Sequence, residues 1–324
     1  MSLRHFITTT LRPAVYHGHG KRPPFFEGWY FKLVDAARGQ AWAVIPGIYV
    51  GEMPAQTHAF IQVLNGNRNV VEYHRFPPEA FAASNRQFDV RIGDNHFTTN
   101  TLILNLPNLQ GRLTFTGTIP WPVTLPSPGV MGWYGWVPVM ECYHGVVSMD
   151  HRIDGRLVHD GHIIDFSGGR GYIEKDWGRH FPRTWVWLQA NHFPTPGTSL
   201  MASVARIPWI GRAFPGFIIG LWHEGMLHRF TTYTGGVLEA VNVADTDVQV
   251  VVRNRRHRLT ITARRSAGAT LLGPTPQGMA PFVTEMLGAA VRVVLTDLDG
   301  QVLFAEESEN AGMEVEGDTS LLQP

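Results

Sequence analysis

The chain has 324 residues with 27 basic and 27 acidic side chains, so its formal net charge is zero. Hydrophobic residues make up 44% of the chain and charged residues only 17%, which is too apolar a composition for an intrinsically disordered protein. There is no basic excess, so we expect no nucleic-acid partner. The single cysteine, Cys142, excludes an intrachain disulfide and a cysteine-rich zinc site.

The N-terminal residues carry arginines but no apolar run of the kind found in a secretory signal. The longest apolar stretches, near Ala41–Val50 and Gly216–Trp222, are shorter than the roughly 20 residues that a helix needs to cross a bilayer. We therefore expect a soluble, cytoplasmic protein that makes at most a transient, peripheral contact with a membrane.

The segment Pro24–Leu33 is predicted to be a strand, with Glu27 on the same face as Phe25, Trp29 and Phe31. Ionising a carboxylate among apolar side chains is unfavourable, so we expect a raised pKa for Glu27 and the capacity to act as an acid. The alternative is a structural Glu27 at the end of a strand, paired with an arginine.

Further strands are predicted along the whole chain, because apolar and polar residues alternate between turn dipeptides. Two short helices are predicted among them, at Pro77–Ser84 and Pro281–Leu287. A final hairpin is predicted from Ala290–Thr296, a turn at Asp299-Gly300 and Gln301–Glu306. The other predicted strands are Ala41–Val50, His58–Leu64, Leu113–Ile119, Val146–Ile153, Trp185–Phe193, Val248–Arg253 and Leu259–Ala263.

Many short strands with few helices predict an all-β sandwich or barrel. The segment Pro120–Pro138 is dense in Pro, Gly and Trp, and Pro is poorly tolerated inside central strands. We interpret it as a connector between two domains, the first over residues 1–130 and the second over residues 131–324.

The segment Val130–His151 follows, and in it His144 lies next to Tyr143 and close to Glu141. A histidine in such company could move a proton. The alternative is an ordinary polar pair within a β-sheet.

In the segment Gly171–Phe193, Glu174 and Asp176 alternate with Lys175 and Trp177. Two carboxylates on one strand face repel each other, so we expect one of the two pKa values to rise.

Beyond Pro182, a second predicted strand carries Trp185, Trp187, Gln189 and Asn191 on one face. Two indoles followed by two amides would suit a ligand with a long apolar body and a polar head. The alternative is the outer face of an amphipathic strand.

Other common sites lack support in the sequence. Among 15 histidines only His17 with His19, and His159 with His162, are closely spaced, and no HExxH motif or facial triad is present, so we expect no metal. No nucleotide-binding loop or GxSxG motif occurs either. The charge run Arg253–Arg258 is either a solvated face or a site for an anionic membrane surface.

Three segments together resemble the tocopherol cyclase family: Pro24–Lys32 (PFFEGWYFK), Gly171–Gly178 (GYIEKDWG) and Trp185–Phe193 (WVWLQANHF). The resemblance implies two lipocalin-like antiparallel β-barrels with few short helices, distantly similar to carotenoid hydratases. Plant members of the family close the chromanol ring of vitamin E on a prenylated hydroquinone, as intramolecular lyases. Asp176 stands where we expect Asn in the plant members.

The resemblance implies an isomerisation that needs no cofactor: an acid protonates an alkene, and a phenolic oxygen captures the resulting tertiary cation. Such a site needs an acid, aromatic faces to stabilise the cation and polar groups to aim the phenol. The candidate acids are Glu27, Glu174 and Asp176. The candidate substrate-binding residues are Trp29, Tyr134, His144, Trp177, Trp185, Trp187, Gln189 and Asn191.

Two other functions fit the same residues. In an isoprenoid alkene hydratase, water instead of the phenol would capture the cation. In a lipocalin-type carrier, an isoprenoid lipid would be bound and not converted.

Overall fold

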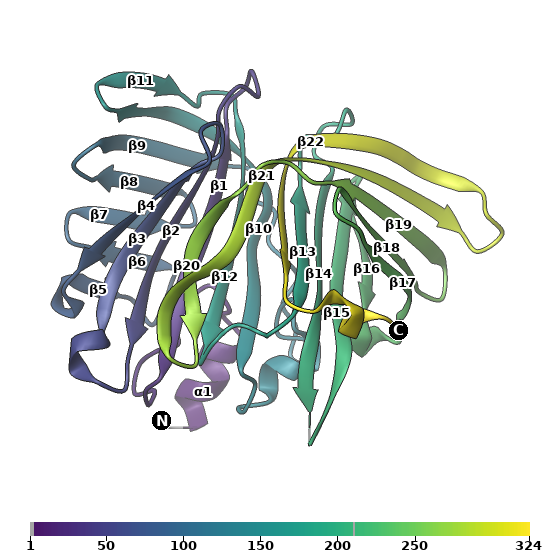
Figure 1. Cartoon of the computed structure of the whole chain (residues 1–324), viewed down its shortest axis with the longest axis horizontal. Coiled ribbons are helices and arrows are strands. Elements are labelled where there is room, and N and C mark those ends of the chain that lie inside the picture. The colour runs from purple at the N-terminus through teal and green to yellow at the C-terminus, as the bar shows by residue number, and fades with distance from the viewer. Residues whose placement is uncertain (1–2, 210) are drawn as a thin grey trace. The chain divides into compact units, whose positions relative to one another are not determined.

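The computed structural model describes residues 3–209 and 211–324 (Figure 1). The chain is an all-β protein with two large antiparallel sheets, one of 12 strands and one of 10. The described residues contain a single α-helix, α1 (Leu3–Thr10), and several short 3-10 turns. The all-β class with few short helices is therefore confirmed. The chain divides into two compact units, and each is described by itself.

The first unit comprises Met1–Phe181 and Leu271–Phe282 and contains the 12-stranded sheet. Its strands follow the order β4-β3-β2-β1-β12-β10-β9-β8-β7-β6-β5, with β11 beside β10. The bounds are β1 Phe25–Val34, β2 Ala41–Val50, β3 His58–Asn65, β4 Val70–Phe76, β5 Phe81–Ala83, β6 Asp89–Ile92, β7 Asn95–Thr98, β8 Thr101–Asn105, β9 Leu109–Thr116, β10 Cys142–His159, β11 His162–Asp165 and β12 Arg170–Gly178.

This sheet curls around one apolar core. Trp29 of β1, in the middle of the sheet, stacks on Phe88 next to β6, with ring centroids 5.5 Å apart. Phe31 lies 5.9 Å from Phe97 of β7. Strands from the middle and from one end of the sheet thus share a core. Within the described residues, the end strands β4 and β5 are not hydrogen-bonded to each other, so the expected closure into a barrel is not seen.

The second unit comprises Pro182–Thr270 and Val283–Pro324 and contains most of the 10-stranded sheet. The order of this sheet is β16-β15-β14-β13-β22-β21-β19-β18-β17, with β20 beside β21. Inward-facing residues such as Val186, Leu188 and Ala190 of β13 build its core. The bounds are β13 Trp185–Ala190, β14 Ser199–Trp209, β15 Arg212–His223, β16 Met226–Thr231, β17 Val237–Val243, β18 Asp247–Arg253, β19 His257–Arg264, β20 Ala269–Thr275, β21 Gly278–Asp297 and β22 Val302–Glu316.

The division between the units differs from the expected boundary at residues 130 and 131. Strands β10 and β12 follow the Pro-rich segment, yet they pair with β9 and β1 of the first sheet. The backbone of Ile119 is also hydrogen-bonded to Asp150 and Met149 of β10, which ties the loop to the same sheet. Pro120–Pro138 is therefore a loop inside the first unit, and the division falls after Phe181.

The predicted hairpin at the C-terminal end is confirmed, because β21 and β22 pair across a turn in which Gly300 has a φ of 91°. The predicted helix at Pro281–Leu287 is wrong, since these residues lie in strand β21. A short apolar run does not distinguish the repeat of a helix from the alternation of a strand. The other predicted helix is a 3-10 turn, Pro78–Ala80, followed by β5.

The described residues contain no helix that is both long and apolar enough to span a membrane.

The segment Leu271–Phe282 is held in the first unit by Gln62 of β3. The amide of Gln62 donates to the carbonyl of Leu272 at 2.8 Å and accepts from its N–H at 2.8 Å. We expect Gln62→Leu to lower the free energy of unfolding by about 1–3 kcal/mol, because both backbone groups lose their partner. Hydrogen exchange over 271–282 should rise. Gln110→Leu, at an exposed position, is the control, and equal exchange in both variants would contradict this docking role.

Candidate active site

The pairing of β1 with β12 brings the segments Pro24–Lys32 and Gly171–Gly178 together. In this register Glu27 lies opposite Trp177, and Trp29 lies opposite Lys175. Side chains of directly opposed residues point to the same face of an antiparallel sheet. Trp29 and Trp177 belong to the apolar core of the first unit, so Glu27 and Lys175 point into that core as well.

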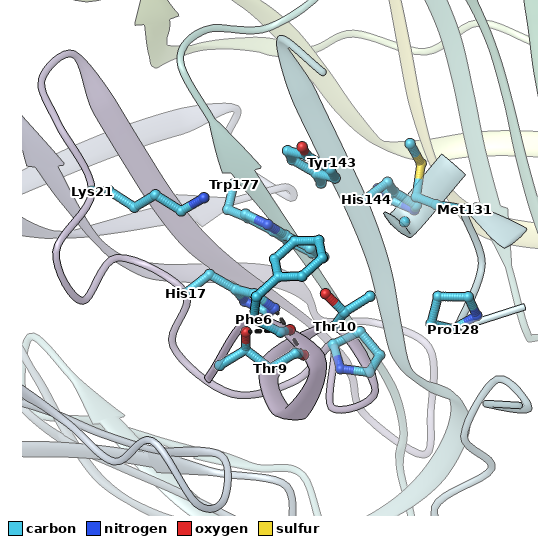
Figure 2. A pocket seen from close by; sticks show the side chains of 12 residues that line it. Phe6, Thr9, Thr10, His17, Lys21, Pro128, Met131, Tyr143, His144 and Trp177 are labelled. Atoms are coloured by element: carbon cyan, nitrogen blue, oxygen red, sulfur yellow. Dashed lines mark hydrogen bonds between the residues drawn. The ribbon is translucent and has the colours of Figure 1, made fainter. Parts of the chain in front are cut away.

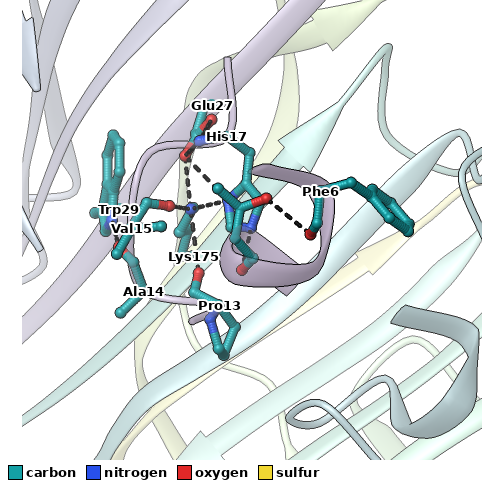
Figure 3. Close-up of polar contacts among 9 residues, drawn as sticks. Phe6, Pro13, Ala14, Val15, His17, Glu27, Trp29 and Lys175 are labelled. Atoms are coloured by element: carbon teal, nitrogen blue, oxygen red, sulfur yellow. Dashed lines mark hydrogen bonds and ion pairs between the residues drawn. The ribbon is translucent and has the colours of Figure 1, made fainter. Parts of the chain in front are cut away.

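The ammonium group of Lys175 sits at the centre of a buried polar cluster (Figure 3). Both Lys175 and Glu27 are fully buried, with 0% of each side chain exposed, and Nζ lies 2.6 Å from Oε1 of Glu27. Nζ also donates to the carbonyls of Pro13, at 3.1 Å, and of Val15. A further contact joins Nζ to Nδ1 of His17 at 2.7 Å. Lys175 thus ties the N-terminal segment to β1 and β12.

His17 completes this inner cluster as a neutral imidazole. Its Nε2 lies 3.1 Å from the carbonyl of Thr9, which can only accept, so Nε2 carries the proton and Nδ1 accepts from Lys175. Burial and the nearby charge of Lys175 lower the pKa of His17 to about 4. The ring stacks on Trp177, with centroids 4.3 Å apart.

The charge states of the pair follow from its surroundings. Burial lowers the pKa of Lys175 to about 8, in spite of the attraction of Glu27, so the amine is protonated at neutral pH. Burial alone would raise the pKa of Glu27, but Lys175 and His17 outweigh it and the pKa is lowered. The raised pKa that we expected for Glu27 is therefore wrong. Glu27 is an ionised acceptor, not a proton donor, because an opposite charge enters the core with it.

A second cluster lies on the opposite face of the same strands. Asp176 of β12 is directly opposite His144 of β10, and Oδ1 of Asp176 lies 2.9 Å from Nδ1 of the imidazole. The other ring nitrogen, Nε2, lies 3.4 Å from Oε2 of Glu174. The hydroxyl of Tyr172 donates to this same oxygen at 2.6 Å. Glu174 and Asp176 thus share one strand face, as predicted, and His144 lies between the two carboxylates.

The number of protons limits the hydrogen bonds that this outer cluster can form. A neutral imidazole has one N–H, whereas both nitrogens of His144 face carboxylate oxygens. With both carboxylates ionised, one of these contacts would bring two acceptors together. One additional proton removes that conflict, either on the second nitrogen or on a carboxyl group. Burial and the charge of Glu174 raise the pKa of Tyr172 well above its ordinary value, so its hydroxyl stays a donor to Glu174.

A pocket of about 490 Å³, a volume that includes space open to solvent, gives access to His144 (Figure 2). It lies between the N-terminal segment and strands β10 and β12. Trp177, Tyr143 and His17 contribute aromatic faces to its wall, and Tyr143 stacks on Trp177 with centroids 5.4 Å apart. The remaining lining residues are Phe6, Thr9, Thr10, Pro13, Lys21, Pro128, Met131 and Gly135.

The outer cluster also has the residue types of a metal site. One ligand atom from each of His144, Glu174 and Asp176 lies within 4.8 Å of the other two. However, Glu174 and Asp176 lie against opposite nitrogens of the His144 ring. A metal ion bound to one ring nitrogen would have only one of the two carboxylates beside it. The arrangement therefore favours the sharing of protons over the coordination of a metal.

The other predicted site residues divide between the units. Trp29 is fully buried in the core of the first unit, where its indole donates to the carbonyl of Ala14. Tyr134 is half-buried in the loop next to the pocket and stacks on Trp133 at 4.0 Å. The second unit holds the predicted wall of Trp185, Trp187, Gln189 and Asn191, all buried and not part of the two clusters.

Sequence reasoning missed Lys175, His17 and Tyr172 as members of these clusters. One signal was available for Lys175, since it is one of three lysines in the chain and lies in an apolar strand, as Glu27 does. Opposite charges on two apolar strands indicate a buried ion pair between them. No local pattern marks His17, because no strand or helix repeat joins it to its partners Thr9 and Glu27, and Lys175 lies far along the chain.

The chain resembles known proteins in sequence and in fold. A sequence profile described as tocopherol cyclase-like matches residues 112–317. The chain is 22% identical over 366 residues to a probable chloroplastic tocopherol cyclase of Oryza sativa subsp. japonica, covering 93% of this chain and 77% of the relative. It is also 22% identical over 365 residues, with the same coverage, to the chloroplastic tocopherol cyclase of Zea mays.

Among solved structures, the crystal structure of CghA with Sch210972 has a TM-score of 0.59 at 13% identity, with 91% of this chain and 89% of that chain covered. The crystal structure of a putative AttH from Nitrosomonas europaea has a TM-score of 0.52 at 14% identity, with 93% and 98% covered. At these identities the likeness concerns the fold alone.

Breaking the buried ion pair of Lys175 and Glu27 should strongly destabilise the protein. Lys175→Met should lower the free energy of unfolding by about 3–5 kcal/mol, because Glu27 is left as a buried, unpaired charge. The double variant Glu27→Gln/Lys175→Met should regain much of this loss. Denaturant titration measures both, with Arg156→Met, in the exposed pair with Asp165, as a control that changes little. A double variant no more stable than Lys175→Met would contradict the explanation.

The neutral state of His17 predicts a pH dependence. Its pKa is lower in the folded than in the unfolded protein, so its contribution to stability is fully present above pH 6.5 and is lost as the pH falls toward about 4. His17→Asn should reduce the slope of unfolding free energy against pH in this window by up to about 1.4 kcal/mol per pH unit. Buried His151, whose pKa is lowered to about 3, contributes equally to both proteins. Identical slopes would show that His17 titrates normally.

Proposed function

The chain belongs to the tocopherol cyclase-like family, and we propose that it is an enzyme that closes an oxygen-containing ring on a prenylated hydroquinone. Its sequence is distantly homologous to tocopherol cyclases, at 22% identity. The observation that carries the proposal is the outer cluster, in which His144 is held between Asp176 and Glu174 beside an aromatic pocket.

The outer cluster supplies the proton in this proposal. The additional proton that His144 shares with Glu174 passes to one carbon of the prenyl double bond, which leaves a tertiary cation on the other. The hydroquinone oxygen then forms a C–O bond with that cation and releases its own proton, which returns to the cluster. The number of protons is restored and no electrons are exchanged, so the reaction is an isomerisation that consumes no cofactor.

The pocket wall suits the charge that develops. Trp177 and Tyr143 line the same pocket as His144, and aromatic faces attract cations. A site with few water molecules keeps the cation from being captured by water. Asp176 has a positioning role, because its contact with Nδ1 fixes the orientation of the imidazole. Glu27 is left out of the proton transfer, since it is ionised and bound to Lys175.

We propose that both sheets are lipocalin-like barrels, supported in the first by the stacking of Trp29 on Phe88 across the curled sheet. We also propose that the buried face of β13 with Trp187 and Gln189 contacts the apolar part of a ligand.

The test is turnover of a prenylated hydroquinone by Glu174→Gln. We expect the rate of ring closure to fall by about 10²–10⁴-fold, as is usual when an acid–base group is removed. His144→Gln should have a similar effect. Glu141→Gln is the matched control, because Glu141 is the neighbouring carboxylate before β10 and 40% of its side chain is exposed. Unchanged unfolding curves would show that the variants are folded.

Three outcomes would contradict the proposal. Undiminished turnover by a folded Glu174→Gln would remove this acid from the reaction. A product that carries oxygen from labelled water would identify a hydratase. Tight binding of the hydroquinone without any conversion by the wild-type protein would identify a carrier.

A further inference from the structure

Exposed apolar side chains gather around the pocket that leads to His144. In the loop of residues 121–139, 67% of Leu125, 44% of Trp133 and 80% of Val139 are exposed. Val123 of the same loop and Ile7 of α1 are exposed as well. We call these five residues the apolar rim. Unclustered exposed apolar residues need no explanation, but a group of them around a pocket indicates a surface that binds something.

The apolar rim is part of the pocket's own framework. Phe6 of α1 and Pro128, Met131 and Gly135 of the loop line the pocket, and they alternate along the chain with the rim residues. Phe6 contacts Trp136 edge to face at 6.0 Å, and the indole of Trp136 donates to the carbonyl of Leu125 at 2.8 Å. Helix α1 and the loop thus form one continuous surface around the opening.

The charges on this surface show what kind of partner fits it. Residues 113–140 contain no Asp, Glu, Lys, Arg or His. Residues 1–26 contain four basic side chains, Arg4, Arg12, Lys21 and Arg22, and no acidic one. Arg12 and Arg22 are exposed, and Lys21 lines the pocket. An uncharged loop with an exposed tryptophan beside a purely basic segment matches a membrane interface, where indoles settle at the headgroups and cations attract anionic lipids.

We propose that the apolar rim and the basic N-terminal segment dock the pocket opening onto the surface of an anionic phospholipid bilayer. A prenylated hydroquinone dissolves in the bilayer, and a pocket that opens onto the membrane receives it without a passage through water. The benefit to catalysis rests on the proposed function, whereas the docking itself does not. Peripheral contact of this kind requires no helix that spans the membrane.

The experiment is co-sedimentation of the full chain with vesicles of phosphatidylcholine, with and without phosphatidylglycerol. We expect binding to the vesicles that contain phosphatidylglycerol. The triple variant Leu125→Ser/Trp133→Ser/Val139→Ser should bind them at least about tenfold more weakly, because burying even one large apolar side chain is worth about this much. If the triple variant folds poorly, the double variant Leu125→Ser/Val139→Ser, which keeps Trp133, replaces it. Its loss of binding should be smaller than that expected for the triple variant.

The matched control removes as many exposed apolar side chains elsewhere. Ile163→Ser/Leu298→Ser/Val302→Ser changes three residues whose exposure is 68%, 56% and 57%, and it should bind as the wild type does. Arg12→Glu/Arg22→Glu should weaken binding to the anionic vesicles and leave any binding to pure phosphatidylcholine unchanged.

The outcomes separate the docking surface from the proposed reaction. The rim variants should convert a short-tailed, water-soluble prenylhydroquinone at the wild-type rate and lose activity only on substrate held in vesicles. Vesicle binding without conversion of either substrate would contradict the reaction and leave the docking surface intact. Absent vesicle binding, an equal loss in the matched control, or a dimer that the triple variant converts to monomer would overturn the docking proposal.

Discussion

The buried pair of Lys175 and Glu27 is the interaction on which the first unit depends. Moving two charges into an apolar core is unfavourable by several kcal/mol for each ion, and only close contact and complete hydrogen bonding offset this. Both conditions are met, because Nζ lies 2.6 Å from Glu27 and three further acceptors from Pro13, Val15 and His17 surround it. The pair therefore selects one register of β1 against β12 and one path of the N-terminal segment, since any other would strand a charge.

The alternation of side chains along β12 connects this pair to the proposed chemistry. Lys175 and Trp177 point into the core, while Glu174 and Asp176 point to the opposite face, where His144 joins them. Fixing one face of the strand fixes the other, so a structural ion pair also positions the cluster to which we assign the proton transfer. The same lysine holds the segment that forms one side of the pocket. The two clusters divide the acids between them: Glu27 is ionised and structural, and Glu174 is the acid in the proposed reaction.

The sequence predicts local features of this protein better than distant pairings. Alternation along Pro24–Leu33 correctly predicts that Glu27 shares a face with Trp29 and Phe31, and the Asp299-Gly300 turn predicts the last hairpin. The pairing of β1 with β12 joins residues almost 150 positions apart, which no local pattern encodes. No local pattern therefore identifies the partner of Glu27 or the direction of its pKa shift, and the one signal is that Lys175, a rare lysine, lies in an apolar strand. For the same reason the Pro-rich loop suggests a domain boundary, although the strands on both of its sides pair within one sheet.

The most direct test of the account follows the proton itself. The protein, equilibrated in D₂O, is incubated with a prenylated hydroquinone, and the product is analysed by mass spectrometry and NMR. The account predicts a cyclised product with one deuterium on the carbon adjacent to the new C–O bond, because the proton from the outer cluster exchanges with solvent before it is transferred. A cyclised product without carbon-bound deuterium, or no conversion at all, would contradict the claim that His144 and Glu174 deliver a proton to the alkene.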